Sequence, residues 1–145
     1  YALGSASVEE INKINILNAS LLSMQRALKK LKHKPSVAYI DGLFAPKNVK
    51  MKCKTFIKGD EKITCISAAS IIAKTTRDLF MIRLAKKYPK YNWDKNFGYG
   101  TSDHLNGLKK YGITKQHRIK FKPVYKILMN RTRETQKDSF LFNNI

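Results

Sequence analysis

Two short, mainly apolar runs, each followed closely by an aspartate beside a glycine, constrain the fold of this chain most strongly. Val37 to Ile40 is apolar without alternation and leads directly into Asp41. A continuously apolar strand is typical of a sheet that is covered on both faces. A second run, Thr55 to Ile57, leads through a lysine and a glycine into Asp60. Both aspartates therefore follow the carboxyl end of an expected strand, the end where open α/β sheets bind ligands.

Helical patterns surround these two runs. Ser7 and Glu10 form a capping-box pattern, and apolar residues then recur at helical spacing, which predicts a helix over residues 8 to 32. A second long helix is expected from Thr64 to Lys87, rich in Ala and Ser where it would lie against the sheet. Strands alternating with helices indicate an α/β fold, and 145 residues fit one domain.

The C-terminal third is expected to be helical, after a loop rich in aromatic residues and glycine. Tyr88 and Pro89 end the long helix, and the loop follows as far as Gly100. A short helix is predicted from Ser102 to Tyr111, stopped by the glycine that follows. A basic helix is expected to begin near Val124, and residues 131 to 145 form a polar tail to which the sequence assigns no structure.

The charge balance points to a polyanionic partner. The chain has 29 Lys and Arg against 10 Asp and Glu, a formal net charge of +19, so nucleic acid is the first partner to consider. A Lys- and Asn-rich composition can also reflect an AT-rich genome. The two cysteines, Cys53 and Cys65, match no zinc or redox spacing, which favours free thiols in the cytoplasm. No apolar run is long enough to span a membrane, and no signal peptide is visible.

Asp41 and Asp60 are the candidate catalytic residues and metal ligands. Neighbouring carboxylates on a basic surface repel each other unless a cation lies between them. A divalent cation such as Mg²⁺ fills that need, and it also binds phosphate oxygens. The alternative is that both aspartates only shape turns, because Asp beside Gly is ordinary turn chemistry.

Tyr99 is the candidate for contact with a base or a sugar, since glycines on both sides let the backbone approach a ligand closely. The alternative is an aromatic ring that fills the core, and this alternative applies more strongly to Trp93. Lys58, Lys74 and Arg118 are candidates for phosphate contacts, the alternative being solvated charges. The three histidines, His33, His104 and His117, show no metal-ligand spacing and are expected in surface or structural roles.

Five segments in a fixed order give the chain a specific resemblance to bacterial ribonuclease HII, over roughly residues 1 to 124. They are GSASVEEINKINI from Gly4, YIDG from Tyr39, KGDEKITCISAASIIAKTTRD from Lys58, GYGTSDHL from Gly98 and HRIKFKPV from His117. The resemblance implies an RNase H-like fold, a mixed sheet with flanking helices, followed by a C-terminal helical segment. It also implies a catalytic domain over residues 1–124, with a basic helix and tail over 125–145.

The resemblance further implies an endonuclease with a two-metal site for Mg²⁺ or Mn²⁺, and a monomer is the default expectation. It would cut the RNA of RNA/DNA hybrids and incise at single ribonucleotides in duplex DNA, leaving 5′-phosphate and 3′-hydroxyl ends. Asp41 and Asp60 match the third and fourth acids of the family's Asp, Glu, Asp, Asp cluster. Tyr99 matches the tyrosine that recognises the junction between ribonucleotide and DNA.

One departure from the family pattern bears on activity. The family's first strand, which carries the leading Asp and Glu and the Gly-Arg-Gly loop that senses the 2′-OH, would lie before Tyr1. We therefore expect this chain to be the C-terminal part of a longer enzyme and to cleave little alone. The rival interpretation is a noncatalytic basic module that binds nucleic acid. A structural protein of a ribonucleoprotein particle would explain the charge but not the two aspartates.

Overall fold

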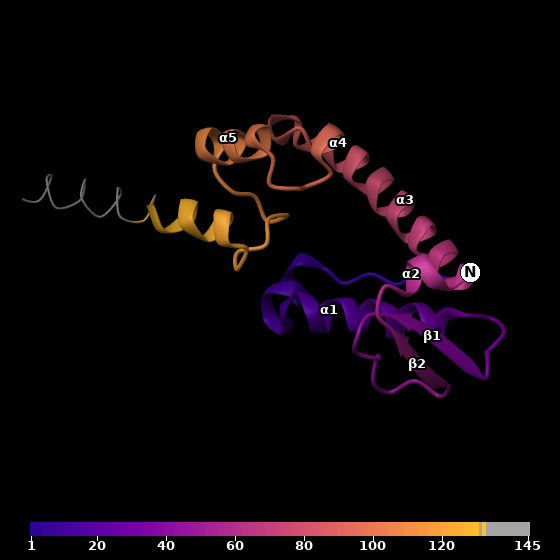
Figure 1. Ribbon diagram of the computed structural model, residues 1–145. Coiled ribbons are helices and arrows are strands. Elements are labelled where there is room, and N and C mark those ends of the chain that lie inside the picture. The colour runs from indigo at the N-terminus through magenta and orange to yellow at the C-terminus, as the bar shows by residue number, and fades with distance from the viewer. Residues whose placement is uncertain (131, 133–145) are drawn as a thin grey trace, which may run out of the picture. The chain divides into compact units, whose positions relative to one another are not determined.

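The computed structural model describes residues 1–130 and 132, and the chain divides into two compact units. Unit 1 is Tyr1–Arg77 and unit 2 begins at Asp78, within the long helix α3 (Thr64–Lys87) (Figure 1). Each unit is described by itself below.

Unit 1 begins with an extended segment followed by helix α1 (Val8–Lys30). The capping box is confirmed: the Ser7 hydroxyl accepts from the Glu10 amide at 3.1 Å, and the Glu10 carboxylate accepts from the Ser7 amide at 2.8 Å. The expectation of an unbroken helix over residues 8 to 32 is wrong, because Asn15 has φ 68° and ψ 171° inside α1. Its side chain accepts from the Asn18 amide at 3.0 Å and so begins a second helical stretch.

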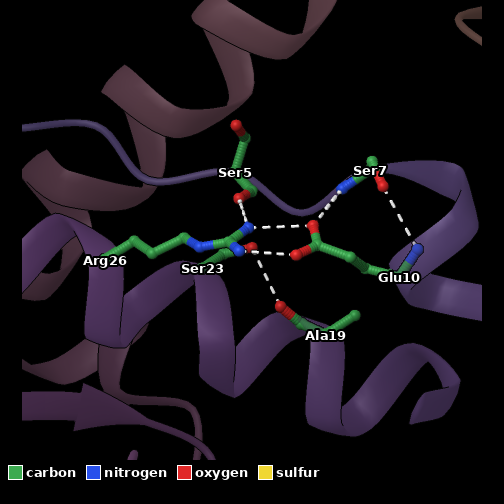
Figure 2. Close-up of polar contacts among 6 residues, drawn as sticks. All are labelled: Ser5, Ser7, Glu10, Ala19, Ser23 and Arg26. Carbon is green, nitrogen blue, oxygen red and sulfur yellow. Dashed lines mark hydrogen bonds and ion pairs between the residues drawn. The ribbon is translucent and has the colours of Figure 1, made fainter. Parts of the chain in front are cut away.

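The extended segment is fastened along α1 by one arginine (Figure 2). Arg26 donates to the Ser5 carbonyl at 2.7 Å and to both carboxylate oxygens of Glu10, at 2.9 and 2.5 Å. A methyl group added at Gly4 would collide with the carbonyl of Ser23, so the two backbones pack directly against each other. Glycine is needed at this close approach.

The sheet of unit 1 consists of β1 (Val37–Asp41) and β2 (Lys52–Phe56), which run parallel with Asp41 opposite Phe56. The second strand thus begins earlier than expected, and Ile57 lies outside it. The other members of the expected mixed sheet are not among the described residues.

The expectation that β1 is covered on both faces is wrong for the residues described. Ala38 and Ile40 are buried, but Tyr39 is 44% exposed and packs only edge-on against Phe56 across the sheet. Side chains alternate along a strand, so this alternation shows that one face of the sheet is covered and the other is open.

After β2 come α2 (Gly59–Lys62) and α3. Ile66, at the start of α3, is buried, and its terminal methyl group lies 2.7 Å from where a Gly59 Cβ would stand. The expected packing of the Ala-rich face is not seen further along, where Ala69 and Ala73 are exposed and Phe80 is 52% exposed. Small side chains permit close packing but do not by themselves create it.

Unit 2 packs short helices around an aromatic core. Its elements after α3 are η1 (Pro89–Tyr91), α4 (Trp93–Asn96), α5 (Ser102–Tyr111) and a helix over 122–130. The predicted bounds of α5 are confirmed, with Gly112 at φ 82° donating back to the Leu108 carbonyl at 2.9 Å. The last helix begins two residues before the expected Val124, and the predicted tail from residue 131 lies outside the described residues, residue 132 excepted. The buried core residues are Met81, Ala85, Tyr91, Trp93, Leu108 and Val124.

None of the helices in the described part of the chain combines the length and the apolar character that crossing a membrane requires.

Candidate active site

Asp41 stands at the carboxyl end of β1, and its side chain is tied to the segment that carries Asp60. Its Oδ1 atom accepts a hydrogen bond from the Gly59 amide at 2.8 Å. The ladder continues past the strand, since the Gly42 amide donates to the Phe56 carbonyl at 2.8 Å. The parallel pairing therefore brings the chain after β2 directly beside the end of β1.

Asp60 follows Gly59 and lies in the first turn of α2. Since the Asp41 carboxylate bonds to the residue before it, the structure brings the two aspartates to the same end of the sheet. Both residues are exposed, so both carboxylates are open to a ligand from solvent. Among the described residues, no group of three or more His, Cys, Asp or Glu side chains gathers into a metal cluster.

The turn-shaping alternative also finds support at Asp41. Its bond to the Gly59 amide fastens the β2–α2 turn to the end of β1, as a structural aspartate would. A carboxylate has about four acceptor positions, so one backbone bond leaves oxygen lone pairs for a cation. The two roles are compatible, and metal binding by Asp41 and Asp60 stays a prediction.

The basic candidates of unit 1 are exposed side chains. Lys58 has a left-handed backbone (φ 53°, ψ 48°), and its ammonium pairs with Glu61 at 3.3 Å. Exposed pairs of this kind contribute little and exchange readily for other anions. Lys74 is exposed on α3.

Tyr99, in unit 2, projects its ring into solvent. The residue is 69% exposed, so the core-filling alternative is wrong for Tyr99, whereas it is confirmed for Trp93, which is 2% exposed. Gly98 has φ 83°, a conformation that favours glycine. The Tyr99 amide donates to the Asn96 carbonyl at 2.8 Å, so the backbone below the exposed ring is held.

Arg118 is half-buried and stacks its guanidinium over the Phe121 ring, 4.9 Å from the ring centroid. The edge of the same ring lies 3.9 Å from where a Gly100 Cβ would stand. Phe121 therefore connects the basic residue to the loop that carries Tyr99. The structure gathers Tyr99 and Arg118 in unit 2, and Asp41, Asp60 and Lys58 at one place in unit 1.

Sequence reasoning missed a pair of bonded imidazoles behind Tyr99. His104 and His117 are each 5% exposed, and their Nε2 atoms lie 3.2 Å apart. The expected structural role is confirmed for both, and His33 lies on the surface as expected. Their pairing carries no signal in the sequence, because the residues are thirteen positions apart and meet only through tertiary packing.

Burial keeps His117 neutral. Desolvation, followed by the positive charge that His104 would carry, lowers the pKa of His117 from 6.5 to about 4. His117 is therefore an uncharged hydrogen-bonding group at neutral pH.

Comparison with known proteins identifies the family. The sequence pattern described as Ribonuclease HII matches residues 1–124. The chain belongs to the ribonuclease HII family. The resemblance drawn from the five segments is thus confirmed over the same range.

Individual relatives agree with this membership. The chain is 54% identical over 128 residues to ribonuclease HII of Pelagibacter ubique, covering 88% of this chain and 69% of the relative. It is 52% identical over 124 residues to ribonuclease HII of Anaplasma marginale, covering 86% of this chain and 51% of the relative. The chain thus spans between about half and two thirds of the length of these relatives.

A solved structure supports the fold. The ribonuclease H2 of Pyrococcus horikoshii OT3 superposes with a TM-score of 0.63 at 27% identity, covering 84% of this chain and 65% of that chain. The chain therefore shares the fold of this ribonuclease H2, and the described residues are mostly helical with a two-stranded parallel sheet.

Proposed function

We propose that this chain carries half of the metal-binding site of an endonuclease that cuts RNA paired with DNA and single ribonucleotides in duplex DNA. One observation carries the proposal: the Asp41 carboxylate bonds to the Gly59 amide, so two acids of a ribonuclease HII chain lie at one sheet end. Enzymes of the α/β class bind ligands at this end of the strands.

The donor set suits Mg²⁺ or Mn²⁺. Both carboxylates are exposed, hard oxygen donors, and Mg²⁺ is usually held by one or two carboxylates together with water and phosphate oxygens. When bound, such a cation activates water and stabilises the leaving oxygen of a phosphodiester. Asp41 and Asp60 would hold the cation, and the Gly59 amide fixes one oxygen of Asp41.

The remaining residues would bind the substrate. The exposed Tyr99 ring offers a face for stacking on a sugar or base, and its hydroxyl offers a partner for a ribose 2′-OH. Lys58, Lys74 and Arg118 would contact phosphates, which the net charge of +19 favours throughout. Arg118 is the best oriented of the three, because stacking on Phe121 limits its rotation.

We assign the catalytic domain to residues 1–124 and a basic helix and tail to 125–145. The family match ends at residue 124, which supports this boundary. We further propose that the protein is a monomer and that it lies in the cytoplasm, a location that the two free thiols, Cys53 and Cys65, support.

The test compares Asp41→Asn with Asp94→Asn in the enzyme that also contains the family's leading acids. Both changes remove one exposed carboxylate charge, but Asp94 lies on α4, in unit 2. We expect Asp41→Asn to abolish Mg²⁺-dependent cleavage of a duplex with one ribonucleotide, and to preserve or strengthen binding because it removes a negative charge facing phosphate. Asp94→Asn should leave the turnover number unchanged.

Normal turnover by Asp41→Asn would exclude Asp41 as a ligand. If the unaltered enzyme binds the duplex but cleaves no substrate with either metal, the hypothesis of a noncatalytic nucleic-acid-binding module is favoured. Salt dependence does not separate the nuclease from the binding module, since release of counterions from six phosphates weakens either complex roughly a thousandfold between 50 and 200 mM salt.

A further inference from the structure

The backbone of Tyr99 is held by the side chain of His104, a residue that the sequence did not connect with substrate binding. His104, in the first turn of α5, has its Nδ1 atom 2.8 Å from the Tyr99 carbonyl oxygen. The same carbonyl accepts from the Thr101 amide at 2.9 Å. Glycines flank Tyr99 on both sides, and glycine leaves the backbone free to take many conformations. The two hydrogen bonds therefore supply the restriction of the Tyr99 backbone that the flanking residues do not.

Protons can be assigned through the whole set of bonds. The Thr114 amide donates to His117 Nδ1 at 2.9 Å, so that nitrogen carries no proton and the His117 proton is on Nε2. His117 Nε2 then donates to His104 Nε2 at 3.2 Å. The same His104 nitrogen also accepts from the Trp93 indole at 3.2 Å. The His104 proton is consequently on Nδ1, where it points at the Tyr99 carbonyl.

The surroundings fix this tautomer. The Tyr91 ring packs edge-on against His117 at 5.0 Å between centroids, and the Trp93 ring lies edge-on to His104 at 6.0 Å. No described buried side-chain nitrogen or oxygen lacks a hydrogen-bond partner. A ring with both nitrogens bonded in an apolar wall cannot turn over without breaking bonds that water would not replace.

We propose that His104 is a positioning residue for ribonucleotide recognition, in which Trp93 and His117 orient its ring so that Nδ1 holds the Tyr99 backbone and aims the exposed phenol at the ribose. The inference rests on the proposed role of Tyr99 and adds the groups that set its direction. His104 itself touches no substrate. It acts only through the carbonyl of Tyr99.

Two conservative variants separate positioning from general support of the fold. In His104→Asn, the side-chain amide stands where Nδ1 stood and still donates to Tyr99, but Trp93 and His117 lose their acceptor. In His104→Gln, the amide reaches the Nε2 position and keeps that acceptor, but the donor to Tyr99 is lost. Tyr91→Phe is the control, because it removes a buried bond to the Gly112 carbonyl, 3.0 Å long, elsewhere in the same core.

The first measurement is hydrogen exchange of the full chain over residues 98–101. His104→Gln should speed exchange of the Tyr99 and Thr101 amides about tenfold, since one hydrogen bond is removed from the loop. His104→Asn and Tyr91→Phe should remain within about twofold of the unaltered chain. If His104 only supported the fold, exchange would be faster in His104→Asn than in His104→Gln. Asn leaves the buried Trp93 and His117 donors without an acceptor, whereas Gln keeps that acceptor.

The second measurement is the ratio of dissociation constants for duplex DNA with and without one embedded ribonucleotide, with Tyr99→Ala as reference. His104→Gln should lower the preference to that of Tyr99→Ala, and His104→Asn should keep it. The inference is overturned if exchange in His104→Gln matches the control, or if the loop loosens and the preference survives. If the unaltered chain and Tyr99→Ala show equal preference for the embedded ribonucleotide, the proposed role of Tyr99 is wrong, and so is the recognition part of the inference. The order of the exchange rates still decides whether His104 holds the loop.

Discussion

The two units of this chain hold their candidate residues in different ways. In unit 1 the buried apolar side chains are few, namely Ala19, Ala38, Ile40 and Ile66, and one face of the sheet is open. In unit 2 a continuous core gathers Met81, Ala85, Tyr91, Trp93, Leu108 and Val124. The candidate metal ligands lie in the first unit and the candidate recognition residue in the second.

The difference concerns how each site is supported. Asp41 is fixed by one backbone bond from Gly59 at the edge of a small sheet. Tyr99 is fixed through its backbone by an imidazole that is itself bonded to Trp93 and His117. The two bonds that directly hold Asp41 and Tyr99 are both partly buried, but the imidazole at Tyr99 is itself fixed by two fully buried bonds, and such a network loses less order to thermal motion than a single bond. We therefore expect unit 2 to keep its geometry under conditions in which unit 1 opens.

The largest expected effect is loss of the core of unit 2. Leu108→Ala should reduce the free energy of unfolding by about 2 to 5 kcal/mol, because the side chain is 1% exposed and leaves a cavity. Leu28→Ala, at a half-buried position of α1, should cost only about 1 kcal/mol. Urea unfolding followed by the single tryptophan, with amide exchange in β1 for unit 1, measures both. Equal losses would show that the two cores are equivalent.

Acid should weaken unit 2 through His117. The pKa of His117 is about 4 in the folded protein and 6.5 in the unfolded chain. Between pH 6.5 and pH 4, the unfolded chain therefore binds a proton at this residue that the folded protein does not bind. Stability from this group is complete above pH 6.5 and falls towards pH 4, by about 3 kcal/mol in total. Urea midpoints between pH 7 and pH 4 measure the slope. His117→Gln should flatten it, and His33→Gln, at an exposed position, should not.

Two glycines sharpen the comparison, one in each unit. Gly107→Ala should cost about 1 to 3 kcal/mol, since the new methyl group would stand 2.6 Å from the Lys90 backbone carbonyl, which cannot move aside. Gly59→Ala meets the end of the flexible Ile66 side chain at 2.7 Å and the Phe56 Cβ at 3.2 Å, and should cost less than Gly107→Ala because no backbone atom blocks the new methyl group. Thermal unfolding of both variants gives the order. A larger loss for Gly59→Ala would mean that unit 1 is the more rigid at this level.

The smallest effect is local to the N-terminal segment. The hydrogen bond from Arg26, helped by the Ser7 amide, lowers the pKa of Glu10 from 4.5 to about 2. The contribution of Glu10 is therefore present above pH 4.5 and disappears as the pH falls towards 2. Glu10→Gln should speed amide exchange over residues 3–7 several-fold at pH 7 while leaving α5 unchanged. Unaltered exchange in the segment would show that Glu10 is not needed to hold it, and that Gly4 packing with the bonds from Arg26 to Ser5 and from Lys30 to Leu3 is sufficient.

Local signals in the sequence were sufficient for some of the helix boundaries. The capping box at Ser7 and the stop at Gly112 are both confirmed, because each depends on a few adjacent residues. The break at Asn15 was missed although Asn15 and Asn18 have capping spacing, since the apolar period of the helix continues through them. The proximity of Asp41 and Asp60 was predictable from the rule that parallel strands end at one edge.

Tertiary relationships were not predictable in the same way. An apolar run such as Val37 to Ile40 does not reveal whether one face or two are covered, and here Tyr39 faces solvent. The exposed Ala69 and Ala73 show that a small-residue pattern does not identify its partner. His104 and His117 have no meaningful spacing, so their bond and its connection to Tyr99 emerge only from the packed structure.

The bond between Asp41 and Gly59 makes one backbone nitrogen sensitive to the electrical state of the site. An amide proton that points at a carboxylate resonates far downfield, and it moves back when a cation draws electrons from that oxygen. The Gly59 cross-peak in a ¹H–¹⁵N spectrum would therefore report binding of magnesium at Asp41, without any requirement that the chain turn over a substrate.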